Sequence, residues 1–183
     1  AKLVPMYLKG WGSSSFMFDK ISAGDVLLHY PYHSFDHFIH FLFEAAHDPL
    51  CREIMITQYR VAEHSEVINT LISAAHSGKK VTVFVELKAR FDEENNLYTA
   101  ELMRKAGIHI IYSIPGLKVH AKVALVLRDA SVKSFACIST GNFNEKTARV
   151  YADSALFTSK PDGVDDLIML FKVIAMFFKT IFT

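Results

Sequence analysis

Val81-Thr82-Val83-Phe84-Val85-Glu86-Leu87 is an apolar run of β-branched and aromatic residues, and it determines the fold that we expect. Such a run predicts a buried strand. Two further apolar runs flank it and two helical patterns separate the three runs, with strands expected at 54–59 and 108–112 and helices at 65–76 and 92–106. This alternation is typical of right-handed βαβ units on a parallel sheet.

The segments on either side of this unit complete the predicted fold. A helical pattern at 34–47 precedes it. Three strand-like runs with short connections follow it, at 118–127, 135–140 and 151–158. We therefore predict an α/β fold with a mixed, largely parallel sheet flanked by helices. Apolar residues at helical spacing from Leu167 to Thr183 predict a last helix that packs on this domain or on a neighbour; attachment to a membrane surface is the alternative.

Composition narrows the class of protein. The 183 residues carry a net charge of only +1, so no global field attracts nucleic acid or membranes, and an anion site must be built locally. Cys51 and Cys137 lie in apolar runs, which favours two buried thiols in a reducing compartment; a disulfide between them is the alternative. The first residues do not resemble a signal peptide, so we expect a cytoplasmic protein.

The segment Gly116 to Val123 carries the clearest chemical signal. In a strand, side chains alternate between faces, so Lys118, His120 and Lys122 are expected on one face. An imidazole between two ammonium groups is costly unless an anion is bound there. A phosphate fits, because the lysines neutralise its oxygens while an unprotonated ring nitrogen attacks phosphorus. An edge strand with a solvated polar face is the alternative.

Polar residues near three other strand ends point to the same chemistry. The segment 139–144 offers small residues and amides to an anion, and Asn142 is placed to orient His120; a plain turn is the alternative. Arg60 and Arg90 follow the runs at 54–59 and 81–87, where open α/β sheets bind ligands. A guanidinium suits phosphate because its fork binds two oxygens. Ion pairs with neighbouring glutamates are the alternative.

The remaining histidines show no spacing typical of a metal site. His33, His37 and His40 are the exception worth noting, because steps of three and four residues place them on one face of a helix. A zinc site there is the weaker interpretation, and core or surface histidines are the stronger one.

The His-x-Lys strand followed by Thr140-Gly141-Asn142-Phe143-Asn144 resembles a phospholipase D half-site. It departs from that pattern because the next acidic residue, Asp129, comes late and because Ser139 replaces a glycine. Longer strings are similar to the polyphosphate kinase family specifically, in the same order along the chain: 25–35, 83–96, 116–122 and 139–149. This resemblance covers residues 16–158.

The resemblance implies a function and roles for single residues. The family transfers the terminal phosphate of ATP reversibly to polyphosphate and uses Mg²⁺. His120 matches the histidine that becomes phosphorylated, and Tyr151 matches a tyrosine near the nucleotide. Arg60 and Arg90 match arginines of a magnesium–phosphate cluster, where a cationic guanidinium binds phosphate oxygens beside the metal. Lys122 and Asn142 are added as phosphate-binding residues on physical grounds.

The resemblance also implies context beyond this chain. The family proteins are multidomain and oligomeric, often at the inner membrane face, and their site uses a second histidine from a following domain. We therefore expect residues 1–20 to be a linker from a preceding domain, 21–160 the phospholipase D-like catalytic domain, and 161–183 a helix leading to a second catalytic domain. ATP or ADP and polyphosphate are the expected partners, and nucleic acid is not. Alternatives are a phosphodiesterase and a non-catalytic polyphosphate-binding module.

Overall fold

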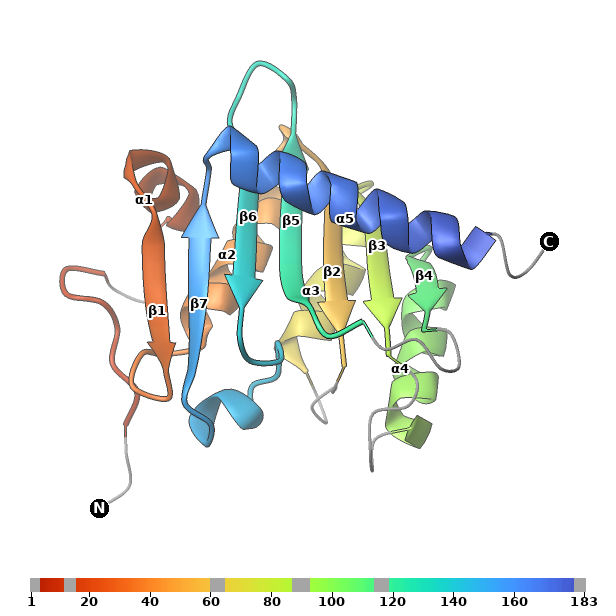
Figure 1. The fold of residues 1–183 in the computed structure, drawn as a ribbon, viewed down its shortest axis with the longest axis horizontal. Coiled ribbons are helices and arrows are strands. Elements are labelled where there is room, and N and C mark those ends of the chain that lie inside the picture. Colours follow the sequence, from red (N-terminus) through yellow and green to blue (C-terminus); the bar gives the residue numbers. More distant parts are fainter. Residues whose placement is uncertain (1–3, 12–15, 60–64, 87–92, 114–118, 180–183) are drawn as a thin grey trace.

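A seven-stranded sheet lies between two layers of helices in the computed structural model (Figure 1). The structure describes residues 4–11, 16–59, 65–86, 93–113 and 119–179, without the side chains of 93–96, 178 and 179. The elements are α1 (Met17–Ala23), β1 (Val26–Tyr30), α2 (Asp36–His47), β2 (Cys51–Gln58), α3 (Glu66–His76), β3 (Lys80–Val85), α4 (Glu93–Lys105), β4 (His109–Tyr112), β5 (Lys122–Arg128), β6 (Phe135–Ser139), a 3₁₀ turn (Thr147–Arg149), β7 (Asp153–Thr158) and α5 (Pro161–Lys179).

The strands lie in the order β1-β7-β6-β5-β2-β3-β4. β2, β3 and β4 are parallel, as expected for βαβ units, and the other neighbouring pairs are antiparallel. The predicted α/β fold with a mixed sheet flanked by helices is therefore confirmed. Its parallel portion is smaller than expected, because the short connection from β5 to β6 reverses the chain direction and leaves no room for a crossover helix.

Sequence patterns located most elements but missed α1, β1 and the 3₁₀ turn and misplaced the starts of β2, predicted at residue 54, and of β5. α1 and β1 have seven and five residues, and no pattern was singled out for either. β5 begins at Lys122 rather than at Lys118. Its pairing with β2 ends at Ile56 and Ala124, and its pairing with β6 ends at Lys122 and Ser139, where β6 itself ends. Residues 119–121 are not part of a strand, and Lys118 lies outside the described residues.

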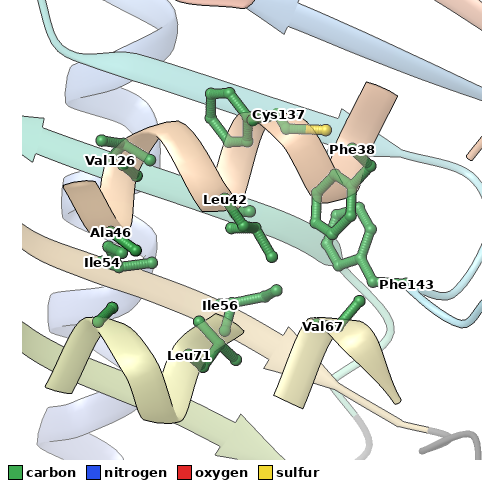
Figure 2. Close-up of a cluster of buried hydrophobic side chains, with 14 of the residues drawn as sticks. Phe38, Leu42, Ala46, Ile54, Ile56, Val67, Leu71, Val126, Cys137 and Phe143 are labelled. Carbon is green, nitrogen blue, oxygen red and sulfur yellow. The ribbon is translucent and has the colours of Figure 1, made fainter. Parts of the chain in front are cut away.

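One face of the sheet carries α1 to α4 and the main core, and the other carries α5 (Figure 1). In the main core, α2 and α3 direct apolar side chains onto β2, β5 and β6 (Figure 2). Phe38 of α2 stacks on Phe143 with ring centroids 4.1 Å apart. Cys51 and Cys137 are buried free thiols, which confirms the expectation for both, and burial raises the pKa of Cys51 to about 11.

The predicted last helix is confirmed as α5, which crosses the sheet with one apolar side inward. Leu167, Phe171 and Ile174 are buried against the strands. Met169, Met176 and Phe177 on its outer side are exposed. Within the described ranges, no helix has the length and apolar character needed to cross a membrane.

His37 is a buried histidine of α2 that ties the first described segment to the core. Its Nε2 accepts a hydrogen bond of 3.3 Å from the Leu8 backbone N–H, and the Tyr7 and Trp11 rings pack against it edge-on. Burial lowers the pKa of His37 to about 4, helped by His40 and His33 and opposed by Asp36. The imidazole is therefore a neutral hydrogen-bond acceptor within the core.

Replacing Phe38 by Ala should lower the free energy of unfolding by about 3–5 kcal/mol, because it leaves a cavity against Phe143. The same change at Phe43 is the matched control: it lies on α2 but is exposed, and it should cost less than about 1 kcal/mol. Urea denaturation of both variants measures the difference. Equal losses would contradict the packing described above.

The stability of the domain should fall as the pH drops from about 6.5 towards 4, in part through His37. The unfolded histidine titrates near 6.5 and the folded one near 4, so the unfolded state binds the extra proton in this window. His37→Gln should flatten the dependence of the unfolding free energy on pH, measured by urea denaturation. His76→Gln, at an exposed histidine, is the control; an equal effect of both changes would contradict this assignment.

Candidate functional site

The mixed topology brings several chain segments to one edge of the sheet, the lower edge in Figure 1. Here β2, β3 and β6 end, while β5 and β7 begin, because β5 runs antiparallel to β2 and β6. We call this the site edge. It places residues 57–59, 119–123, 139–144 and 151–153 beside one another although they are far apart in the sequence.

Lys122 is a buried cation at the centre of the site edge, with 6% of its surface exposed. Its Nζ donates a hydrogen bond of 2.8 Å to the His120 backbone carbonyl. The same ammonium lies 4.9 Å from the centroid of the Tyr59 ring, a cation–π contact. Lys122 therefore binds the backbone of His120 and fixes a positive charge next to that residue.

Tyr59 and Thr57 hold the segment that carries His120. The Tyr59 hydroxyl donates a hydrogen bond to the Val119 carbonyl. Burial, with a smaller effect of the Glu86 charge, raises the pKa of Tyr59, so the hydroxyl stays a donor. Thr57 Oγ1 accepts a hydrogen bond of 3.0 Å from the Val123 N–H and donates one of 3.4 Å to the Val123 carbonyl.

His120 is exposed at this edge rather than turned into the apolar interior. Its ring centroid lies 6.5 Å from that of Tyr59, with the planes at 64°. Val119, Ala121 and Val123 pack on the side of α5, so the alternation predicted for them is present although residues 119–121 are not strand. The backbone is thus held by Tyr59 and Lys122 while the imidazole faces solvent.

The turn after β6 is built around a close approach of two segments. Thr140 Oγ1 donates a hydrogen bond of 2.8 Å to Asp153 Oδ1 and accepts one of 3.0 Å from the Ser154 N–H. A Cβ on Gly141 would lie 2.8 Å from the Asp153 Cβ and closer still to its carboxylate. Gly141 is therefore required by space, and it allows the chain to turn towards Asn142.

The remaining residues of this turn have mixed roles. Asn142 Oδ1 is buried and has no hydrogen-bond partner among the described residues. Asn144 Oδ1 accepts from the N–H groups of Lys146 and Thr147 and stabilises the turn, while Glu145 accepts from Ser65 Oγ and the Val67 N–H at the start of α3.

The other predicted site residues are only partly placed. Tyr151 precedes β7 and is 56% exposed. Arg60 and Arg90 lie outside the described residues, two positions after the end of β2 and five after the end of β3. The structure therefore brings His120, Lys122 and the Asn142 turn to one edge and leaves the roles of both arginines as predictions.

Tyr59 and Thr57 were not singled out from the sequence. Their side chains act across the sheet, on residues about sixty positions later. The available signal was a hydroxyl-bearing residue at a strand end, which is too common to select one position.

The described residues do not form a magnesium site by themselves. Mg²⁺ prefers carboxylate and water oxygens, and in the described part of the chain no group of three or more His, Cys, Asp or Glu side chains is placed to hold a metal. His120 and Lys122 offer no such oxygen, and Asp153 is bound to Thr140.

Comparisons with known proteins agree on the kind of domain. The family model described as polyphosphate kinase C-terminal domain 1 matches residues 16–180. Polyphosphate kinase of Escherichia coli K12 is 50% identical over 159 residues, which cover 86% of this chain and 23% of that protein. Polyphosphate kinase of Vibrio cholerae is 46% identical over 163 residues, which cover 87% of this chain and 23% of that protein. The chain thus spans about a quarter of the length of these relatives.

Solved structures give the same picture of the fold. The crystal structure of polyphosphate kinase from Porphyromonas gingivalis has a TM-score of 0.81 at 49% identity, covering 94% of this chain and 30% of that one. Nuc from Salmonella typhimurium, a phospholipase D family member, has a TM-score of 0.63 at 14% identity, and the match covers 81% of this chain and 91% of Nuc. The latter likeness shows that the fold is phospholipase D-like, as predicted.

Gly141→Ala should lower the free energy of unfolding by about 1–3 kcal/mol, because the added methyl group displaces Asp153 or the turn. Gly24→Ala is the control, since a Cβ there meets nothing within 4 Å, and it should change stability by less than about 0.5 kcal/mol. Thermal or urea denaturation compares them. A Gly141 variant as stable as the Gly24 variant would contradict the close approach.

Proposed function

Since this chain belongs to the polyphosphate kinase C-terminal domain 1 family, we propose that it is the part of a polyphosphate kinase whose His120 takes up a phosphoryl group. The donor is ATP in one direction and the polyphosphate end in the other. The observation that carries this proposal is an exposed imidazole on a backbone segment that a buried ammonium and a buried tyrosine hold in place.

The proposed reaction has two balanced steps. In the first, the lone pair of an unprotonated His120 ring nitrogen attacks the terminal phosphorus of ATP, the bond to the bridging oxygen breaks, and ADP leaves with that electron pair. In the second, a terminal oxygen of polyphosphate attacks the phosphohistidine, and the nitrogen–phosphorus bond breaks. The imidazole returns to its starting form, and the polymer is one phosphate longer.

Lys122 is suited to stabilise the charge that builds up on the phosphate oxygens. An ammonium largely removed from water interacts more strongly with a nearby anion than an exposed one does. Its contacts with Tyr59 and the His120 carbonyl fix its position before substrate binds, so less reorganisation is needed during the reaction. Arg60 and Arg90 are proposed to add bidentate phosphate contacts.

Magnesium is proposed to enter with the substrate phosphates rather than on a ligand set of this domain. Arginine side chains cannot ligate a cation, and the described carboxylates are not grouped around the site edge to do so. When bound to the phosphates, the ion would neutralise part of their charge. The relatives' name supports phosphotransfer, and the ion itself remains a prediction.

We further propose that the chain works within a longer protein, because it spans about a quarter of its relatives. That protein would bind ATP or ADP and polyphosphate, not nucleic acid, and the other domains would complete the site. Asn142 would orient His120 or the phosphate, and exposed Tyr151 would contact the nucleotide. The homo-oligomeric state and the location in the cytoplasm or at the inner membrane face also remain predictions.

The full-length enzyme incubated with γ-labelled ATP should carry an acid-labile, base-stable label, as a phosphohistidine does. His120→Ala should abolish this label and lower the synthesis of polyphosphate by at least about 10⁴-fold, since the nucleophile is lost. His109→Ala is the matched control: it is an exposed histidine at the start of β4, far from the site edge, and it should keep the label.

Label that survives in the His120 variant would refute the assignment of the nucleophile. Metal-free hydrolysis of a phosphodiester, without polyphosphate synthesis, would favour the phosphodiesterase alternative.

The 183-residue chain by itself should bind inorganic polyphosphate weakly and should not synthesise the polymer from ATP. The expected reason is that the rest of the site comes from the remaining length of the protein. Titration calorimetry measures the binding, and polymer formation with Mg·ATP measures the activity. ATP-dependent synthesis by this chain alone would contradict the proposal.

A further inference from the structure

Gln58 is a buried amide at the site edge whose donor group has no partner. It is the last residue of β2 and has 2% of its surface exposed. Its backbone is fixed, since its carbonyl accepts a hydrogen bond of 3.0 Å from the Glu86 N–H. Its side-chain Nε2 is buried and makes no hydrogen bond within the described part of the chain.

Packing alone does not account for this amide. A buried donor without an acceptor lowers the stability of the folded state, whereas an apolar side chain of similar size at the same place avoids that loss. Such unpaired groups are few in folded proteins, and each calls for an explanation such as strain, a functional role or a bound water or ion. The unpaired Nε2 is a donor for which the described residues supply no acceptor.

The register places this donor beside Lys122. The last pair of the two strands is Ile56 with Ala124, and beyond it the Thr57 side chain binds the Val123 backbone; continuing the same register by two residues would set Gln58 opposite Lys122. Residues directly opposite in an antiparallel pair point to the same face, with Cβ atoms about 4.5–5.5 Å apart. On its other side, Lys122 pairs with Ser139. From this register we infer that the amide lies on the same face of the sheet as the Lys122 side chain.

We propose that Gln58 is a further substrate-binding residue of this site and that its Nε2 donates a hydrogen bond to a phosphate oxygen held beside Lys122. The inference rests on the proposed function, because it takes the anion to be the phosphate that reacts at His120. A phosphate oxygen only accepts hydrogen bonds, so it satisfies the amide and the ammonium together. The same chemistry is offered by the terminal phosphate of ATP and by the end of polyphosphate.

The test uses the full-length enzyme with Gln58→Leu, which keeps the size of the side chain and removes the donor. KM should rise about 10-fold or more, as for the loss of one hydrogen bond to a charged group. A rise for ATP in the forward direction assigns the contact to the nucleotide, and a rise for polyphosphate in the reverse direction assigns it to the polymer. Gln58→Glu, of equal size but negative, should weaken binding further.

Stability measurements separate binding from a structural role. The unliganded Leu variant should melt at the same temperature as the wild type or higher, while inorganic tripolyphosphate should raise its melting temperature less. Thr82→Val is the matched control, a buried polar residue on β3 that contacts Glu53 at 3.5 Å. It should leave KM and the effect of tripolyphosphate unchanged.

The possible failures are distinguishable. If Gln58→Leu leaves both KM values unchanged, or lowers stability without weakening tripolyphosphate binding, the role of Gln58 is overturned while labelling of His120 still supports the proposed function. If His120→Ala retains the phosphoryl label, the proposed function fails whatever Gln58 does.

Discussion

The buried ammonium of Lys122 is the group on which the site edge depends. A cation removed from water must be compensated, and here it contacts the His120 carbonyl and the face of the Tyr59 ring. The Lys122 ammonium thus holds the His120 carbonyl, while the Tyr59 hydroxyl holds the Val119 carbonyl just before it. The result is a fixed charge next to an exposed imidazole, which is an arrangement suited to bind and transfer a phosphoryl group.

The mixed direction of the strands is what allows this arrangement. β5 is antiparallel to β2, so its first residue lies beside the last residue of β2, and β6 returns to the same edge. In an all-parallel sheet, the start of β5 would lie at the opposite edge from Tyr59 and Gln58. The antiparallel half of the sheet therefore contributes His120 and Lys122, while the parallel half contributes the strand ends that hold them.

The local parts of this fold were predictable from sequence, and the long-range parts were not. Apolar periodicity located the βαβ unit, α2 and α5, because the burial of each depends on a pattern within one element. β1 was missed although it is no shorter than β4 and β6, which were predicted. The extent of the parallel sheet and the start of β5 were wrong, because both depend on which strands become neighbours.

In the candidate site, too, the local features could be predicted from the sequence and the long-range contacts could not. His120 and Lys122 were predicted from their spacing in one strand-like run and from the family resemblance, and the structure places them together at the site edge. The roles of Tyr59 and Thr57 depend on hydrogen bonds to residues about sixty positions away, which no local pattern contains. Gly141 was predicted as a turn residue, but the space it leaves for Asp153 is visible only in three dimensions.

The central claim is that the imidazole of His120 bonds covalently to phosphorus beside the Lys122 ammonium. A crystal structure of the full-length enzyme, trapped during turnover with ATP, tests it most directly. We predict density for a phosphoryl group joined to a ring nitrogen of His120, with an oxygen directed towards Lys122 Nζ. A phosphoryl group on another side chain, with His120 away from the substrate phosphorus, would contradict the account.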